Sequence, residues 1–524
     1  MERFVIKVIF SYIILIGFGV QIIGGVQEQP LRTAFHFRPP KNWMNGPMYY
    51  KGVYHLFYQY NPDAAVWGNI SWGHSVSYNL IDWFHLQDAM NPNEPYDING
   101  CWSGSTTILP GPNIPVILYT GNNFADEEVQ NLATPKNLSD PMLQEWVKSK
   151  HNPIMSPVDD IDPKFYRDPT TAWLKPDHKT WCTLVGAQIN GYGAAFLYKS
   201  SDFITWKKAD KTFHLSNKTD IDLDYYIIGK YDWENDGFKA DFEFMDERIR
   251  LRYDYGIFYA SKTFYDEAKK RRVLWGWVTE ADHPADDMRK GWSGLQSIPR
   301  SILLDKSGEQ LIQWPVKEVE KLRGRKVTIK DKEINSETVL EVAGITASQA
   351  DVEVSFRLSH LKGVESIDES SYDPQLLCSQ MNASVRGAYG PFGLLAFASK
   401  DLKEQTAVFF RVLKRQDKFV VLMCTDQSRS SLKTPVKETI FGSFLDVDPN
   451  QKISLRTLTD HSIIEAFGGE GKSCITARVY PKLAIGKNSH IFAFNNGSKS
   501  VKISSLNAWS MNKAHIAKAH DHNQ

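Results

Sequence analysis

At 524 residues the chain is long enough for two or more hydrophobic cores, and 12% aromatic content with 15 tryptophans favours an all-β protein. Lysine plus arginine and aspartate plus glutamate each number 61, so the zero formal charge gives no reason to expect nucleic acid or an anionic membrane as partner. A neutral polar ligand such as a sugar is compatible with this balance.

Residues 1–26 have the pattern of a secretory signal peptide. Arg3 and Lys7 give a basic start, residues 8–20 are apolar, and Gly24 and Gly25 are small residues suited to cleavage. The alternative is a membrane anchor, but the apolar run is shorter than the roughly 20 residues that span a bilayer. We therefore expect a secreted chain without membrane association after cleavage.

A β-hairpin is predicted near the start of the mature chain. Residues 48–50 and 53–60 are aromatic and β-branched runs, and Lys51-Gly52 between them suits a two-residue turn. This arrangement places residues 43–45 where the chain enters a sheet, with Gln59 near the far end of the second strand.

The segment before this hairpin, residues 43–47, reads W-M-N-G-P. Here the sequence resembles glycoside hydrolase family 32, specifically the plant cell-wall invertases and fructan exohydrolases. Those enzymes carry W-M-N-D-P-N-G, and its Asp is the catalytic nucleophile. The three residues D-P-N are absent from this chain, so the resemblance implies the family while the nucleophile is missing.

A pattern recurs along the first half of the chain. Residues 77–83 (SYNLIDW) are echoed by residues 200–206 (SSDFITW) and more weakly by residues 261–266 (SKTFYD). The first two copies lie about two blade lengths apart, at roughly 50–60 residues per propeller blade. Two ordinary β-turns would be the alternative, but the resemblance implies a five-bladed β-propeller.

The second half predicts a β-sandwich. Residues 317–332 are charged and lack the blade pattern, which suggests a linker, and the short alternating strands from residue 333 onward are typical of a sandwich. Residues 460–467 also resemble the family's C-terminal domain. The expected division is a signal peptide (1–26), a catalytic-type propeller (30–316), a linker (317–332), a sandwich (333–511) and a loose tail (512–524).

The resemblance also implies a catalytic plan. A retaining glycosidase needs a nucleophilic carboxylate and an acid/base carboxyl about 5–5.5 Å apart. The family adds a third carboxylate, from R-D-P, that stabilises the transition state. Arg167-Asp168-Pro169 is intact, so Asp168 takes that role by match. The alternative is that Asp168 is a turn residue paired with Arg167.

The family's acid/base motif, W-E-C-P/V-D-F, has no counterpart in this sequence. It should follow Trp206, but the family pattern resumes near Asp224, which leaves the segment short by most of a blade. We therefore expect one incomplete blade. Four carboxyl groups nearby are interpreted as solvated turn residues rather than substitutes: Asp220, Asp222, Asp224 and Glu234.

The sugar-binding residues are better preserved. By match to the family, Asn45, Gln59 and Ser103 hydrogen-bond the fructosyl hydroxyls. An aromatic wall is implied as well, although blade packing is the alternative role for each tryptophan. The full set of expected substrate-binding residues is Trp43, Asn45, Gln59, Trp67, Trp102, Ser103 and Arg167.

The chain contains five cysteines and five N-x-S/T sequons. Cys378 and Cys424 match a pair that is disulfide-linked in the plant enzymes, and Cys101, Cys182 and Cys474 are expected to be buried thiols. Glycosylation is expected at the five sequons. These begin at Asn69, Asn137, Asn217, Asn382 and Asn496.

The resemblance implies a secreted β-fructofuranosidase of the apoplast or cell wall that hydrolyses terminal β-fructosyl residues of sucrose or fructans by a retaining mechanism. The family uses no cofactor and no metal, and cell-wall polysaccharide is a further candidate partner. Because both catalytic segments are absent, this chain is expected to be impaired. The alternatives are a non-catalytic sugar-binding relative and a mis-spliced product of an active gene, and the choice between sucrose and fructan stays open.

Overall fold

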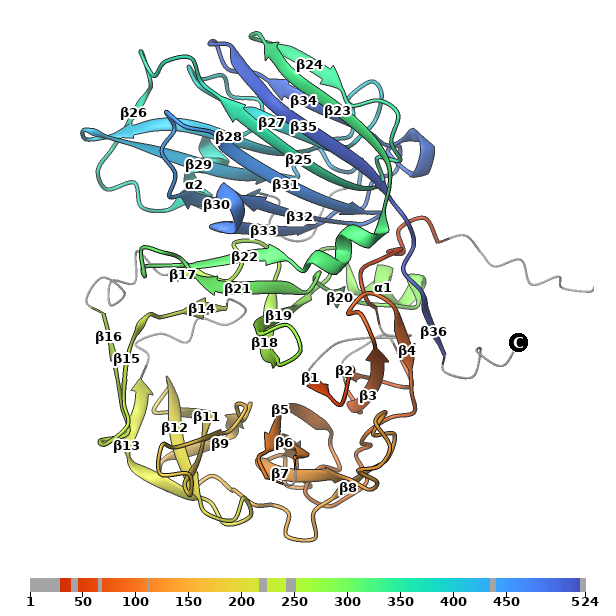
Figure 1. The fold of residues 1–524 in the computed structure, drawn as a ribbon, viewed down its shortest axis with the longest axis vertical. Helices are drawn as coiled ribbons and strands as arrows, with labels where there is room; N and C mark the ends of the chain where they lie inside the picture. The colour runs from red at the N-terminus through yellow and green to blue at the C-terminus, as the bar shows by residue number, and fades with distance from the viewer. Residues whose placement is uncertain are drawn as a thin grey trace, which may run out of the picture.

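A computed structural model describes residues 29–38, 46–64, 68–111, 113–215, 224–241, 251–433 and 440–518. The expected signal peptide lies outside these residues. Figure 1 shows two bodies, a ring of small sheets and a two-layered sandwich packed against one side of the ring. The all-β fold is confirmed: apart from one C-terminal strand, the sheets of the ring come from residues 47–315, and those of the sandwich come from the chain that follows.

The first sheet of the ring contains the predicted hairpin. β1 (Pro47–Tyr50) and β2 (Val53–Tyr60) pair antiparallel, with Tyr50 opposite Val53. Lys51 and Gly52 have φ of 45° and 86°, the two positive values that a type I′ turn requires. The turn chemistry of the sequence therefore fixes the register of this hairpin. The sheet continues with β3 (Ser71–Ser77) and β4 (Trp83–His85).

The second and third sheets follow in chain order and are antiparallel. The second consists of β5 (Cys101–Leu109), β6 (Ile114–Asn122), β7 (Glu128–Pro135) and β8 (Trp146–Lys148). The third consists of β9 (Ile161–Arg167), β10 (Trp173–Leu174), β11 (Trp181–Ile189), β12 (Tyr192–Ser200) and β13 (Lys207–Leu215).

The two stronger copies of the sequence repeat, residues 77–83 and 200–206, form the same type of turn. The Ser77 Oγ accepts hydrogen bonds from the backbone N–H groups of residues 79 and 80, and the Ser200 Oγ accepts from those of residues 202 and 203. The indole N–H groups of Trp83 and Trp206 each donate to the carbonyl three residues earlier. The shared hydrogen bonds explain why the pattern recurs once per blade in these two sheets.

The fourth sheet is the irregular one. In the described part of this region, β14 (Tyr225–Tyr226) pairs with β17 (Leu251–Arg252), and β15 (Gly229–Asp232) pairs with β16 (Gly237–Ala240). Two separate ribbons therefore stand where the other blades have sheets of four or more strands. The expected incomplete blade falls at this position in the ring.

The fifth sheet closes the ring against the first. Its strands are β18 (Tyr259–Asp266), β19 (Arg271–Val278), β20 (Leu295–Gln296), β21 (Arg300–Leu304) and β22 (Leu311–Pro315). Helix α1 (Pro284–Lys290) lies between β19 and β20. Phe264 and Trp275 of this sheet share a core with Trp83 of the first, which joins the two ends of the ring.

The sandwich contains two sheets around one large apolar core that includes Val352, Phe392, Phe410 and Ile475. One sheet has the order β23 (Arg323–Ile334), β35 (Val501–Met511), β25 (Gln349–Arg357), β31 (Ile453–Asp460), β32 (Ile463–Gly468), β33 (Ser473–Arg478). The other has the order β24 (Thr338–Glu341), β34 (His490–Asn495), β27 (Phe392–Ala398), β28 (Thr406–Arg415), β29 (Lys418–Asp426), β30 (Ile440–Leu445), with β26 (Ser366–Ile367) beside β28. Helix α2 (Pro374–Gln380) packs on β29 and β30.

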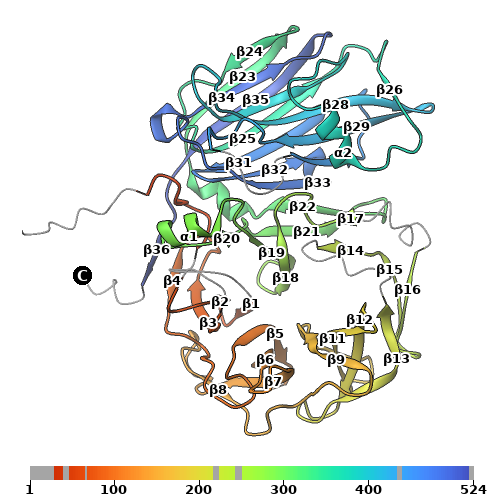
Figure 2. The same ribbon diagram turned by 180° about the vertical axis from the view of Figure 1, so that it is seen from behind.

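Two expectations about the ends of the sandwich are wrong. The stretch expected to be a linker forms a 3-10 helix (Lys317–Leu322) and then β23, which pairs with β35. Edge strands often carry lysine and are largely solvated, so the charged composition of β23 resembles that of a linker. The tail is also partly ordered, because β36 (Ile516–Lys518) pairs in parallel with β4 of the first blade (Figures 1 and 2).

A buried charged network joins the two domains. His36, which precedes the first blade, contacts Asp460 through Nδ1 at 2.9 Å and Glu465 through Nε2 at 3.1 Å. Arg300 of the fifth blade contacts the same Glu465 at 2.5 Å and Asp254 at 2.9 Å. All the side chains in these pairs are inaccessible to solvent, so their charges depend on protein partners and not on water for compensation.

Candidate active site

The expected transition-state carboxylate, Asp168, follows the last residue of β9 in the third blade. Its φ of 63° lies in the left-handed region, which Asp tolerates better than most residues. Its N–H donates to the Thr120 Oγ1 at 3.0 Å. The second blade therefore anchors the backbone of Asp168, and its side chain is exposed.

Arg167 forms an ion pair with Glu128, a residue that no sequence motif marks. Its Nε lies 2.9 Å from Oε2 of Glu128 in β7, and its Nη2 lies 2.7 Å from the Glu128 Oε1. The same carboxyl accepts the N–H of Tyr166 at 2.8 Å. The described contacts contain no ion pair between Arg167 and Asp168, so the alternative of a turn aspartate paired with its neighbour is not what the structure contains.

Burial gives Glu128 unusual acid–base properties. Desolvation raises the pKa of this carboxyl to about 7, although Arg167 and the Tyr166 N–H act in the opposite direction. No motif signal marks Glu128, because it opens an ordinary strand and meets Arg167 only when two blades come together.

Gln59, Trp102 and Ser103, three of the predicted substrate-binding residues, lie close together. The Ser103 Oγ donates to the Gln59 Oε1 at 3.3 Å, and the Gln59 Nε2 donates to the Cys101 carbonyl at 3.3 Å. The Arg167 guanidinium lies 5.3 Å from the centroid of the half-buried Trp102 ring. Residues from three blades thus form one polar and aromatic surface next to Asp168.

The fifth blade contributes Lys262, another residue without a motif signal. Its Nζ donates to the Ser105 Oγ at 3.2 Å, which links β18 to β5 in a blade that is not its neighbour in the ring. Burial lowers the pKa of Lys262, while Asp168 and Asp224 act to raise it. The ammonium group therefore sits in the electrostatic field of two carboxylates on different blades.

The structure differs from the expectation for Asp224. The sequence suggests a solvated turn carboxylate, but the Asp224 Oδ2 accepts the N–H of Ser261 at 2.6 Å, and burial raises the pKa of Asp224. Asp224 is therefore a half-buried group that joins the residual fourth blade to β18. Glu234 is exposed, as expected. Asp220 and Asp222 lie outside the described residues.

Several predicted substrate-binding and glycosylation residues lie outside the described part of the chain, and glycosylation at the others stays a prediction. Trp43, Asn45, Trp67 and Asn217 are not described. Of the glycosylation sites, Asn69 and Asn137 are exposed, whereas Asn382 and Asn496 are half-buried. The Asn496 Nδ2 also donates to the Ala383 carbonyl at 3.2 Å, which leaves this amide less available to a glycan.

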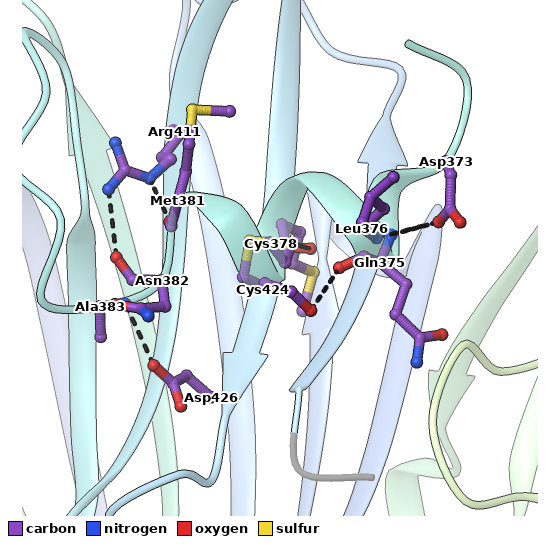
Figure 3. The surroundings of a disulfide bond; sticks show 12 residues. Asp373, Gln375, Leu376, Cys378, Met381, Asn382, Ala383, Arg411, Cys424 and Asp426 are labelled. Carbon is purple, nitrogen blue, oxygen red and sulfur yellow. Dashed lines mark hydrogen bonds between the residues drawn. A yellow bond between two sulfur atoms is a disulfide. The ribbon is translucent and has the colours of Figure 1, made fainter.

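The expected disulfide between Cys378 and Cys424 is present (Figure 3). It fastens α2 to β29 on one face of the sandwich. Cys101, Cys182 and Cys474 are free and buried, as expected.

One acidic cluster lies away from these residues. Glu280, Asp282 and Asp287 are close enough to one another to hold a cation. The Lys290 Nζ lies 3.0, 2.9 and 2.9 Å from these three carboxyl groups, so the chain supplies the cation itself.

Comparison with known proteins identifies the family. The model described as Glycosyl hydrolases family 32 N-terminal domain matches residues 36–222 and 214–315, and the model described as Glycosyl hydrolases family 32 C terminal matches residues 318–510. The chain belongs to glycosyl hydrolase family 32. Family 32 is a hydrolase family, and its propeller and sandwich are the two bodies seen here.

Individual relatives agree along nearly the whole chain. It is 51% identical to an insoluble isoenzyme of beta-fructofuranosidase from Arabidopsis thaliana, over 94% of this chain and 92% of the relative. It is 49% identical to fructan 6-exohydrolase from Beta vulgaris, over 93% and 88%. The crystal structure of fructan 1-exohydrolase IIa from Cichorium intybus superposes with a TM-score of 0.91 at 49% identity, covering 94% of this chain and 99% of that one.

Proposed function

We propose that the chain carries the fructoside-binding part of a β-fructofuranosidase site, but that it hydrolyses sucrose or fructans very slowly as written. The observation that supports this most is the assembly of Asp168, Arg167, Trp102, Ser103 and Gln59 at one place on three blades of a family 32 propeller. The known structure of a related fructan 1-exohydrolase in complex with 1-kestose supports the same ligand class.

Each residue of this surface has a definite role in the proposal. The exposed Asp168 carboxylate accepts hydrogen bonds from sugar hydroxyls and stabilises the positive charge that develops on the fructosyl ring. Gln59 and Ser103 hydrogen-bond the hydroxyls of the terminal fructosyl unit, and the Trp102 ring packs against it. Glu128 holds Arg167 over Trp102 and is a positioning residue.

The chain lacks the two carboxyl groups that cleave the glycosidic bond in the family plan. In the intact family plan a carboxylate attacks the anomeric carbon, and an acid protonates the leaving oxygen. This chain lacks D-P-N after Asn45 and the W-E-C segment after Trp206. The N-terminal family model matches in two stretches that meet at residues 214–222, which supports an interruption at the second of these positions.

Two alternatives remain within this proposal. The chain is either a sugar-binding relative or the mis-spliced product of an active gene. The abrupt loss of whole motifs between well-matched segments favours the second. Secretion to the cell wall fits the names of the relatives, one of which is a cell wall isozyme from Pisum sativum. Within the described residues, no helix is long and apolar enough to cross a membrane.

The direct test is to measure sucrose and 1-kestose turnover by the purified chain beside an intact relative. Loss of a nucleophile from a concerted catalytic set costs on the order of 10⁶ in rate, and loss of a general acid alone costs roughly 10²–10⁴. Binding of 1-kestose without turnover, abolished by Asp168→Asn, is the expected result. Turnover within about tenfold of the relative would contradict the absence of both catalytic groups.

A further inference from the structure

A cavity of about 660 Å³ lies between the propeller and the sandwich, and nothing in the proposed reaction uses it. Its propeller wall includes residues of β14 and β17, the ribbon of the incomplete blade. Its sandwich wall includes β29, β30 and the start of α2. Figure 1 shows these elements facing one another at the edge of the domain interface. A cavity of this volume is in the range of small-ligand sites.

Two arginines in this cavity lack an acidic partner. The Arg252 guanidinium lies 5.3 Å from the ring centroid of Tyr225 and 5.8 Å from that of Tyr255. The Arg415 guanidinium lies 5.4 Å from the Tyr372 ring and 4.6 Å from the Phe444 ring. Among the described residues, neither arginine forms an ion pair, and the Arg415 Nε is buried without a hydrogen-bond partner.

The other charged groups of the cavity are already paired. Lys472 contacts the Asp446 carboxylate at 3.1 Å. The Asp373 Oδ1 caps α2 by accepting the N–H groups of Gln375 and Leu376 at 2.9 and 3.0 Å (Figure 3). The Arg415 Nη2 donates to the Ser371 carbonyl, which leaves its Nε and Nη1 without an acidic partner. The cavity therefore has two stacked guanidinium groups with N–H donors that can face an anionic ligand. Guanidinium binds carboxylate through paired, charge-assisted hydrogen bonds.

Aromatic side chains at the cavity suit the face of a sugar ring. Tyr372 is 39% exposed and Phe419 is 37% exposed, although both are large and apolar. The wall that carries them is held in place before any ligand binds, because the Cys378–Cys424 disulfide fastens α2 to β29 (Figure 3). A preformed wall reduces the entropy lost on binding.

We propose that this cavity binds an acidic oligosaccharide, a short chain of uronate sugars, whose carboxylates pair with Arg252 and Arg415 and whose rings pack on Tyr372 and Phe419. The site is separate from Asp168 and does not depend on turnover. It would hold the secreted chain to an acidic wall polymer although the formal charge of the protein is zero.

The test uses the full chain and measures binding of trigalacturonate by calorimetry, at low and high ionic strength. Maltotriose serves as a neutral trisaccharide, and succinate as a carboxylate without a sugar ring. We expect trigalacturonate to bind more tightly than either, and to bind less tightly as salt is raised. Arg252→Gln and Arg415→Gln should each weaken binding about tenfold or more. Arg415→Lys, which keeps the charge without the planar fork, should bind with intermediate affinity.

Two control variants make the result specific. Arg325→Gln removes an exposed arginine of β23 outside the cavity and should bind as the unmodified chain does. Asp168→Asn should lose 1-kestose binding and keep trigalacturonate binding, so the two sites fail separately. Melting curves of each variant show that it is folded. Absence of trigalacturonate binding, equal binding of maltotriose or succinate, or unchanged affinity in both glutamine variants would overturn the proposal.

Discussion

At the scale of single residues, the match to R-D-P singles out Asp168 in the sequence. The residues around it come from other blades and are known only from the structure. Asp168 lies next to Arg167, which Glu128 holds through two contacts across blades. Lys262 and Asp224 come from two further blades. The contacts of Glu128, Lys262 and Asp224 could not be predicted from the sequence, because each is an ordinary residue of a strand or loop until the ring brings the blades together.

Glu128 leads to a prediction about pH. Its folded pKa of about 7 lies above its ordinary value, so the folded state binds more protons than the unfolded state between about pH 4.5 and 7. This group's contribution to stability is therefore full below that window and falls as pH rises through it, by up to about 3 kcal/mol.

Glu128→Gln should remove this dependence. We expect the free energy of unfolding of the unmodified chain to fall relative to that of the variant between pH 5 and pH 7, as measured by chemical denaturation at both values. A difference between the two proteins that stays constant with pH would mean that Glu128 titrates normally.

At the scale of elements, local chemistry explains which parts were predictable. The first hairpin and the two repeat turns follow from turn residues and serine and tryptophan side chains that act within a few positions. The strand β23 was not predictable, because its charged residues are compatible with either a linker or an edge strand. Its pairing with β35 joins residues at opposite ends of the sandwich sequence.

The disulfide gives an element-scale prediction. It closes a loop with a sequence separation of 46 residues, so in the chain-entropy model it stabilises the sandwich by about 4 kcal/mol. Replacing both Cys378 and Cys424 by Ala should lower the unfolding free energy of the sandwich by about that amount, measured by denaturant titration. Peptide mapping without reduction should recover the linked pair, and two free thiols in secreted protein would contradict the pairing.

The incomplete blade gives a second prediction at this scale. Two short ribbons leave more strand edge unpaired than a four-stranded blade does. Limited proteolysis should therefore cut first between residues 206 and 241, leaving a resistant fragment that contains residues 323–511. Mass spectrometry identifies the fragments, and early digestion of the sandwich with this stretch uncut would show that the blade is well ordered.

At the scale of the whole molecule, the charged network couples the two domains. Burial alone would lower the pKa of His36, but the hydrogen bonds that its ring N–H groups donate to Asp460 and Glu465 raise it. Its stabilising contribution is therefore full below the unfolded pKa of about 6.5 and is lost as pH rises through the folded pKa. Burial tends to raise the pKa of Asp460 and of Glu465, yet their partners lower it, so their contribution is lost as pH falls.

This network predicts that Arg300→Met destabilises the chain strongly. Removing one partner leaves Asp254 and Glu465 buried without their counter-charge, which costs about 3–5 kcal/mol for a buried pair. Denaturation monitored by tryptophan fluorescence measures the loss. Arg272→Met, an exposed arginine of the same domain, is the control and should change stability by less than about 1 kcal/mol. Equal effects of the two substitutions would show that the network does not hold the domains together.

The central claim is that the chain retains the sugar-binding surface and has lost two separate catalytic segments. Four proteins test it most directly in one assay of fructose release from sucrose and 1-kestose. They are the chain as written, the chain with Asp-Pro-Asn inserted between Asn45 and Gly46, the chain with a W-E-C segment inserted between β13 and β14, and the double repair. Only the double repair should be active, because each single repair lacks either the attacking carboxylate or the proton donor. Full activity from a single repair, or none from a soluble double repair, would contradict the account.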